Sequence, residues 1–469
     1  MNPVRSFCHL AATLLVTAGI VRAAPRPNII LFLADDLGWT GTACYGSDFY
    51  ETPNIDRMAK EGMRFTNGFA AAANCAPSRA TIMSGQYTPS HGILYVGPGT
   101  YQERYRKNNG HLKKFRMLQP RGATILAERI QTLAENLKTA GYRTGMFGKW
   151  HLGLGDQHPA KRGFDVAIES HGKHWGFKTD PETEHPKDQY LSDFLAGQAV
   201  QFIKESGEKA FFLYYADFLV HKPFEAKEKY LKHFGNKKPG KHQRSPMAGA
   251  MIKSLDDSLG GILKALDEQG IADDTLVVFT SDNGGLSYEE DGSKNENTSN
   301  LPLRGRKGSE YDGGLRVPWI VRWPSQVAGG TVNKTPIQHI DLFPTFQSVA
   351  GAKRPTQKLH GRNLHPLLKG VRGFQSERDI FWYLPGYSAF HKPSVMVRRG
   401  SWKLIRRLDE DEFELYNTTH DVGEQRNLSE AEPELASSLN QSAVAWLDAL
   451  DAPRMKPNPE FDPVLGRKR

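Results

Sequence analysis

A short stretch from Asn74 to Gly85 combines a nucleophile-sized side chain with the features of a helix start. Pro77 suits a first helical turn and Gly85 suits a helix end. The unpaired N–H groups of such a helix start, with Arg79 one turn in, form a cradle for a tetrahedral oxyanion. The sequence therefore predicts an anion site at Cys75. The alternative is a buried structural thiol, because free cysteine is among the most buried residue types.

Oxygen ligands follow two apolar runs that read as buried parallel strands. Residues 27–34 lead to Asp35 and Asp36, and residues 275–280 lead to Asp282 and Asn283. Adjacent carboxylates repel each other unless a cation lies between them. Because all four are hard oxygen ligands without His or Cys partners, the set indicates Ca²⁺ or Mg²⁺ and disfavours Zn²⁺. The alternative for the Asp pair is a solvated turn.

Three further positions carry groups that suit anion chemistry. Lys149 and His151 lie two residues apart after the predicted strand 143–147, and in an extended chain both would face one anion. His221 follows the predicted strand 211–216, where it could protonate a leaving oxygen. Lys307 belongs to a basic, glycine-rich stretch, 303–318, of the kind that packs close to an anion. Exposed lysines, core histidines and an ordinary turn are the alternatives.

The elements that must position these groups alternate between strands and helices. Helices are predicted over 52–62, 132–140, 189–206 and 250–266, which places the reactive groups at the carboxyl ends of strands in an α/β sheet. Beyond about residue 370 the pattern changes. Residues 394–406 and 413–416 predict short antiparallel strands with Gly400 at a turn, and 431–450 predicts a closing helix.

The segment Cys75-Ala76-Pro77-Ser78-Arg79 resembles the C-x-P-S-R signature of the type I sulfatases, and residues 148–153 resemble a second signature of that family. The resemblance runs in family order from about Pro27 to the C-terminal part, and it includes residues 339–345. Within that family, the sequence resembles the arylsulfatases, and bacterial members in particular. It implies an alkaline-phosphatase-like α/β fold, in which helices sandwich a mixed sheet, and a small C-terminal antiparallel sheet with a helix.

The resemblance also implies a mechanism. Cys75 would be oxidised to formylglycine, whose hydrate attacks sulfur with help from Asp282. One Ca²⁺ would be bound, and the implied ligands are Asp35, Asp36, the residue derived from Cys75, Asp282 and Asn283. Arg79, Lys149 and Lys307 would offset the sulfate charge. His221 would serve the leaving alcohol, and His151 would help release sulfate. Asp312 stands where the family commonly has Glu, which is a mild departure.

The N-terminus has the pattern of a secretory signal over residues 1–23: Arg5, an apolar run from Leu10 to Ile20 and a small-residue end. We therefore predict an exported protein, periplasmic or secreted, without a transmembrane segment. The predicted division is a signal peptide (1–23), a catalytic domain (24–370) and a C-terminal subdomain (371–469). Cys8 leaves with the signal, so Cys44 and Cys75 are too few for a disulfide scaffold.

The net charge is +9, or +7 once Arg5 and Arg22 are removed with the signal. No nucleic-acid-binding module is recognisable. Residues 101–121 hold seven cations: Arg104, Arg106, Lys107, Lys113, Lys114, Arg116 and Arg121. They are interpreted as a solvated loop or as the approach of a sulfated polymer. His391 lies in a predicted loop that could overhang the site. Whether it contacts the substrate or not is left open.

The expected activity is hydrolysis of a sulfate ester, with a sulfated carbohydrate or an aryl sulfate as substrate. A formylglycine-generating or anaerobic maturating enzyme is the expected partner. Two alternatives stay open. One is a phosphodiesterase or phosphonate monoester hydrolase on the same scaffold, and the other is an inactive sulfatase-like binding protein.

Overall fold

The computed structural model describes residues 26–466 except 98, 108–110, 287–297, 372–373, 375–376, 389 and 411. The predicted signal peptide lies outside the described residues. Within them, no helix has both the length and the apolar character needed to cross a lipid bilayer.

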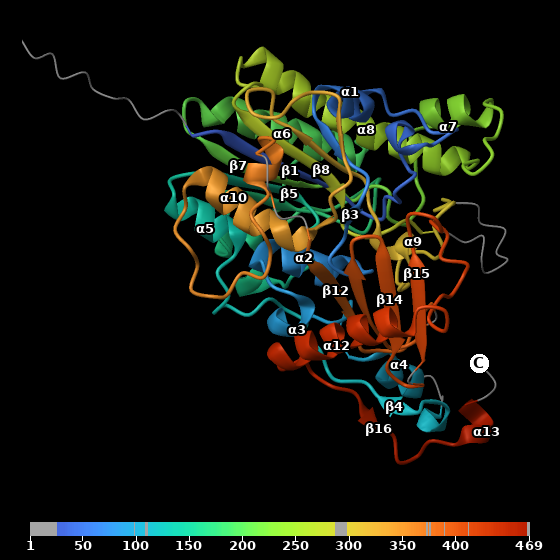
Figure 1. Ribbon diagram of the computed structural model, residues 1–469. Coiled ribbons are helices and arrows are strands. Elements are labelled where there is room, and N and C mark those ends of the chain that lie inside the picture. Colours follow the sequence, from blue (N-terminus) through green and yellow to red (C-terminus); the bar gives the residue numbers. More distant parts are fainter. Residues whose placement is uncertain are drawn as a thin grey trace, which may run out of the picture.

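A large mixed sheet forms the centre of the molecule (Figure 1). Its strands, in spatial order, are β10 (Thr331–Asn333), β2 (Met63–Phe65), β9 (Trp319–Arg322), β8 (Thr275–Ser281), β1 (Asn28–Ala34), β7 (Phe211–Ala216), β5 (Arg143–Gly148) and β6 (Val166–Glu169). The strands from β8 to β6 are parallel, whereas β9 is antiparallel to both of its neighbours. All seven residues of β1 are buried, as expected for a strand with both faces covered.

Helices cover both faces of this sheet. Ile29, Leu31 and Leu33 of β1 join a core with α2 (Cys75–Ser84), α5 (Leu133–Thr139) and α10 (Leu342–Ala350). Ile30 and Phe32 face the opposite core. That core is closed by α1 (Pro53–Glu61), α6 (Leu191–Ser206), α7 (Glu228–Gly235) and α8 (Pro246–Glu268). The predicted sandwich of helices around a mixed sheet is confirmed.

The C-terminal part is a second, four-stranded antiparallel sheet with one helix across it (Figure 1). Its strands are β12 (Asp379–Leu384), β13 (Ser394–Arg399), β14 (Trp402–Arg407) and β15 (Phe413–Asn417), and the helix is α12 (Pro433–Ala449). One face packs on α12 through Leu439, Ala443 and Leu447. The other face packs on Phe69 and Ala73, just before α2. The second sheet thus shares a core with the segment that leads to Cys75.

Short elements complete the fold: β3 (Gly68–Phe69) paired with β11 (Ile337–Gln338), β4 (Met117–Leu118) paired with β16 (Lys456–Pro457), α3 (Thr88–His91), α4 (Tyr101–Lys107), α9 (Asp312–Leu315), α11 (His365–Leu368) and α13 (Pro463–Gly466). The described residues between 101 and 121 thus include a helix, a short 3₁₀ turn (Leu112–Lys114) and a strand, where the sequence had left a loop as one interpretation.

Candidate active site

Two neighbouring strands deliver the carboxylates. In the parallel pairing of β1 with β8, Ala34 lies opposite Ser281, so the residues that follow each strand end side by side. The Asp36 N–H donates to Asp282 Oδ1 at 3.2 Å, and all three Asp side chains are fully buried. The oxygens of Asp35, Asp36 and Asp282 and the sulfur of Cys75 lie within 4.8 Å of one another. The strand pattern thus brings together residues 246 positions apart in the chain.

Cys75 is the first residue of α2, with Asn74 in extended conformation at the N-cap. Its Sγ lies 3.7 Å from Asp35 Oδ1. Burial raises the pKa of the Cys75 thiol to about 12. The unmodified side chain is therefore a neutral thiol at neutral pH and a weak nucleophile.

Two cations face these carboxylates from α2 and the end of β5. Arg79 Nε and Nη2 donate to Asp282 Oδ2 at 3.0 and 2.8 Å, and its Nη1 donates to the Lys149 carbonyl at 2.6 Å. Lys149 Nζ forms an ion pair with Asp35. Burial alone would lower the pKa of Lys149, but Asp35 raises it above its usual value. Burial would likewise raise the pKa of Asp35, but Lys149, His221 and Arg79 hold it well below its usual value.

A divalent cation fits the oxygen-rich side of the cluster. Burial and the nearby charge of Asp35 raise the pKa of Asp282 to about 6, so the carboxylates repel one another where they stand. The Asn283 side-chain nitrogen donates to Asp36 Oδ1 at 2.7 Å, while its buried Oδ1 has no hydrogen-bond partner among the described residues. An unpartnered amide oxygen beside three buried carboxylates is a ligand set for Ca²⁺ or Mg²⁺.

Lys307 contacts the cluster at Asp36. Its Nζ lies 2.6 Å from Asp36 Oδ1 and 2.8 Å from Asp36 Oδ2. The backbone around it is held on both sides of the site, because Lys307 N donates to the Gly285 carbonyl and Gly308 N donates to the Ala73 carbonyl. Burial would lower the pKa of Lys307, but Asp36 raises it well above its usual value. Lys307 is therefore a charged contact between the loops after β8 and before α2.

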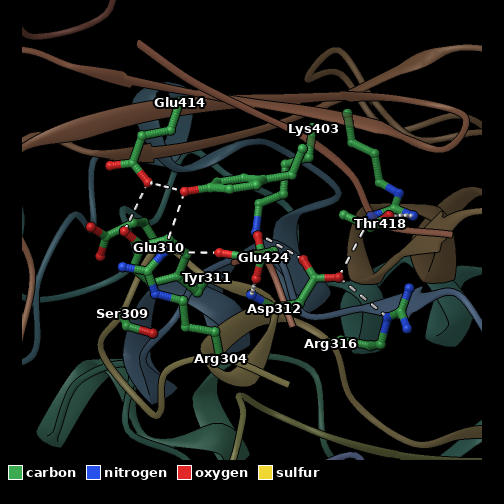
Figure 2. A network of polar contacts seen from close by, with 12 residues as sticks. Arg304, Ser309, Glu310, Tyr311, Asp312, Arg316, Lys403, Glu414, Thr418 and Glu424 are labelled. Carbon is green, nitrogen blue, oxygen red and sulfur yellow. Dashed lines mark hydrogen bonds and ion pairs between the residues drawn. The ribbon is translucent and has the colours of Figure 1, made fainter. Parts of the chain in front are cut away.

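A buried ion cluster anchors the loop that carries Lys307 to the C-terminal sheet. Figure 2 shows Lys403 of β14 reaching between the carboxylates of Asp312 and Glu424, at 2.8 and 2.7 Å. All three side chains are fully buried. The Asp312 N–H also donates to Glu424 Oε2 at 2.7 Å, and Arg316 lies 3.4 Å from Asp312 Oδ2. Asp312 is thus part of the anchor and does not join the cluster around Cys75.

A second set of contacts holds the same loop from β14 and β15 (Figure 2). Arg407 pairs with Glu310 and Glu414, and the Tyr311 hydroxyl donates to Glu414 Oε2 at 2.9 Å. The Arg304 guanidinium lies 3.8 Å from the centre of the Tyr311 ring. Together with the ion cluster, these contacts fix the loop from residue 304 to 316 on the C-terminal sheet.

His221 lies at the rim, after a tight turn that follows β7. Its Nε2 is 3.7 Å from Asp36 Oδ2, and its ring Nδ1 lies 2.7 Å from the Lys222 carbonyl. Burial lowers the pKa of His221 despite the opposing effect of Asp35 and Asp36. The turn is tied to β1, because the Asp35 N–H donates to the Leu219 carbonyl at 2.8 Å. The ring thus points Nε2 towards the carboxylates.

His151 reaches the site by a different path from the one the sequence predicts. Its φ is 65°, so the chain turns there, and the prediction that an extended backbone places Lys149 and His151 on one face is wrong. Burial and the charges of Lys149 and Arg79 lower the pKa of His151 to about 3. His151 is thus neutral at neutral pH and close enough to Lys149 and Arg79 for their charges to lower its pKa.

Sequence reasoning missed His171, in the loop after β6. Its ring lies 6.4 Å from that of His151, and its pKa is lowered by burial and by the positive charge of Lys149. A lone histidine after a short edge strand carries no distinguishing signal.

His391 forms hydrogen bonds with Ser388 and with the Lys392 carbonyl. Its contact with substrate stays a prediction.

Comparison with known proteins agrees with this geometry. Residues 27–352 match the sulfatase family, and residues 306–445 match the family described as N-sulphoglucosamine sulphohydrolase, C-terminal. A sulfatase of Formosa agariphila is 32% identical over 520 residues, covering 92% of this chain and 90% of the relative. Human N-acetylgalactosamine-6-sulfatase is 32% identical over 421 residues, covering 83% of this chain and 75% of the relative.

Solved structures have the same fold. The crystal structure of Ps i-CgsB with k-i-k-neocarrahexaose superposes with a TM-score of 0.76 at 28% identity, covering 90% of this chain and 92% of that one. The phosphonate monoester hydrolase of Agrobacterium radiobacter superposes with a TM-score of 0.64 at 20% identity, covering 91% of this chain and 96% of that one. The second likeness concerns the fold alone.

Proposed function

This chain belongs to the sulfatase family and is a sulfuric ester hydrolase, and we propose that it desulfates a sulfated carbohydrate through a formylglycine derived from Cys75. The observation that carries the proposal is the convergence of Arg79, Lys149 and Lys307 on the buried surroundings of Cys75. Three fixed cations around one reactive position suit a substrate group that is a tetrahedral anion.

The nucleophile and the cation are supplied by groups that the folded chain accommodates. A formylglycine at position 75 would supply, as its hydrate, a hydroxyl nucleophile. Asp35, Asp36, Asp282, Asn283 and residue 75 would hold Ca²⁺, which supplies positive charge to the sulfate oxygens. The raised pKa of Asp282 and its position beside Cys75 suit it to accept the proton of the attacking hydroxyl.

The remaining side chains orient and release the sulfate. Arg79 is held rigidly by Asp282 and the Lys149 carbonyl, so its guanidinium needs little reorganisation to meet an anion. Lys149 and Lys307 flank the site from β5 and from the loop anchored to the second sheet. His221 presents Nε2 at the rim, where the alcohol would depart, and His151 would help release the sulfate.

The substrate class is supported by the relatives. One acts, by its name, on N-acetylgalactosamine 6-sulfate, and one was solved with a neocarrahexaose. We extend the proposal to an exported protein that is matured by a formylglycine-generating or anaerobic maturating enzyme. We also retain the division into a signal peptide (1–23), a catalytic domain (24–370) and a C-terminal subdomain (371–469).

The test combines mass spectrometry with a substrate panel. The Cys75 peptide of matured protein should carry an aldehyde oxygen in place of sulfur, and the protein should release sulfate from defined sulfated sugars. Cys75→Ser should abolish turnover, whereas Cys44→Ser, at the other cysteine of the mature chain, should retain it. An aryl phosphodiester serves as the rival substrate. Faster hydrolysis of that diester than of every sulfate ester would favour the phosphonate hydrolase alternative, and no turnover of either would favour the binding protein.

A further inference from the structure

Nine exposed cations from two distant parts of the chain meet at one end of the molecule. We name this the basic surface: Arg104, Arg106, Lys107, Lys113, Lys114, Arg116, Arg121, Arg454 and Lys456. Figure 1 shows its elements, α4, β4 and β16, gathered below the C-terminal sheet together with α13. Folding thus adds two C-terminal cations to the seven that the sequence places in residues 101–121.

Ordered contacts hold the two parts of the basic surface together. β16 pairs with β4, with Lys456 opposite Leu118. The Asn458 side chain donates to the carbonyls of Leu112 and Phe115 at 2.9 and 2.7 Å. Phe115 is itself buried. The cations therefore project from a built scaffold and not from a solvated loop.

The basic surface contains a cavity of about 480 Å³. It is lined by Leu118, Gln119, Pro120, Arg121, Pro453, Arg454 and Lys456. Three cations around a hollow with proline and leucine walls combine charge with apolar contact. Such a lining suits a ring-shaped, anionic group better than a free inorganic ion.

Positive charge exceeds negative charge across this region. Glu103 pairs with Arg121 at 2.8 Å, and Asp448 pairs with Arg454 at 2.5 Å. The other acidic residues within 101–121 and 448–466 are Asp451, Glu460 and Asp462. Nine cations thus stand against five carboxylates in these two segments. Because the cations are exposed, their attraction for a polyanion is screened by salt.

A short segment connects the basic surface to the mouth of the catalytic site. Tyr387 packs on Phe115 with ring centres 4.9 Å apart, and three residues later the Phe390 ring lies 4.2 Å from the Arg306 guanidinium. Phe390 also lies beside Gly308, next to Lys307. Three residues span at most about 11 Å. A chain bound in the catalytic site can therefore extend onto the basic surface.

We propose that the basic surface is a second, non-catalytic binding site for a sulfated polysaccharide, which holds the polymer while one of its sulfate groups is removed. The proposal rests on the proposed function, because the sulfated carbohydrate substrate identifies the polyanion. It predicts that polymer binding depends on these cations, while turnover of a small aryl sulfate does not.

The test compares two double variants that change the net charge equally. Lys113→Glu with Lys456→Glu alters the basic surface. Lys232→Glu with Lys238→Glu alters exposed lysines at and just beyond α7, at the opposite end of the molecule in Figure 1. Binding of labelled dextran sulfate is measured by fluorescence anisotropy in a Cys75→Ala background, with unsulfated dextran as the blank. Hydrolysis of 4-nitrophenyl sulfate is measured with matured protein carrying the same double variants.

The basic-surface variant should raise the Kd for dextran sulfate at least five-fold at low salt, and the difference should shrink as salt is added. The α7 variant should change it less than two-fold, and 4-nitrophenyl sulfate turnover should stay the same in both. Equal losses in both variants, no loss in the first, or equally tight binding of double-stranded DNA would overturn the proposal. Failure of the matured wild type to hydrolyse 4-nitrophenyl sulfate would count against the proposed function, and the binding result would still stand.

Discussion

At the level of single residues, the site consists of buried carboxylates whose charge is balanced by neighbouring cations and N–H groups. Asp35, Asp36 and Asp282 are fully buried, and each is balanced by a cation or an N–H group within hydrogen-bond distance. Beside them, the buried Oδ1 of Asn283 has no hydrogen-bond partner among the described residues. Because buried polar atoms are rarely left without partners, this oxygen marks the side from which a cation would be bound.

Replacing Asn283 with Leu should therefore remove most of the stabilisation by Ca²⁺. For the wild type, Ca²⁺ at 100 times its Kd should raise the free energy of unfolding by about 2.7 kcal/mol. The measurement is urea unfolding with Ca²⁺ or with EDTA. The matched control is Asn236→Leu at the exposed end of α7, which should keep the full calcium effect. A calcium effect that persists in Asn283→Leu would remove Asn283 from the ligand set.

Replacing His221 with Gln should affect substrates according to their leaving groups. A general acid contributes about 10² to 10⁴ in rate when the leaving alcohol is poor, and little when it is already acidic. We expect kcat/KM to fall at least a hundred-fold for a sulfated sugar and less than ten-fold for 4-nitrophenyl sulfate. Equal losses for the two substrates would assign His221 to binding and not to proton transfer.

At the scale of elements, helices and sheets hold one another through buried polar groups. The Ile93 N–H donates to His91 Nδ1 at 3.1 Å, so the ring proton lies on Nε2, which is 3.1 Å from Thr81 Oγ1. This histidine joins α3 to α2, the helix that begins with Cys75. Likewise, the cluster of Lys403, Asp312 and Glu424 joins β14 to the loop that carries Lys307.

The buried His91 should make the protein sensitive to acid. Burial lowers the pKa of His91 from 6.5 to about 3, so above pH 6.5 both the folded and the unfolded states are neutral there. Below pH 6.5 the unfolded state binds a proton that the folded state refuses, and stability falls by about 1.4 kcal/mol per pH unit down to about pH 3. Urea unfolding of His91→Gln between pH 7 and 4.5 should show a shallower slope than the wild type, while exposed His420→Gln should not. Identical slopes would contradict this role.

Replacing Lys403 with Met should damage both stability and catalysis. It leaves the buried Glu424 carboxylate without its cation, and Asp312 with only the longer contacts to Arg316 and Arg398, which costs about 3–5 kcal/mol. Because the same loop carries Lys307, kcat/KM for an aryl sulfate should also fall at least ten-fold in protein that remains folded. Exposed Lys369→Met is the control. If the two variants unfold at the same urea concentration, the cluster does not anchor the loop.

For the molecule as a whole, the second sheet supports the catalytic site, because it shares a hydrophobic core with the segment before α2. Trp382 and Met396 share a core with Phe69 and Ala73, and the Trp382 indole donates to the Ala70 carbonyl at 2.7 Å. A chain ending at residue 370 should therefore expose this core and lose the anchor of Lys307. We expect it to aggregate or to bind a hydrophobic dye, and to hydrolyse no aryl sulfate. A monomeric, active product would show that the second sheet is dispensable.

The sequence anticipated what depends on local pattern and on recognised motifs. The apolar runs before Asp35 and Asp282 read correctly as buried strands, and parallel pairing then brought the two residues together. The anchor at Lys403 was not predictable, because a lysine in an antiparallel strand normally reads as a solvated side chain. His171 and the turn at His151 were missed for a related reason, since each depends on how distant segments pack and not on spacing.

The burial of Cys75 sets an order of events in the life of the chain. Cys75 is only 2% exposed in the folded structure, where Asp282 lies beside it. A separate maturating enzyme, as proposed above, would reach this thiol before the fold is complete. Asp282 is synthesised 207 residues after Cys75, which at about 5–20 residues per second takes roughly ten to forty seconds. The proposed oxidation of Cys75 would therefore have to take place before the chain around Asp282 folds against it.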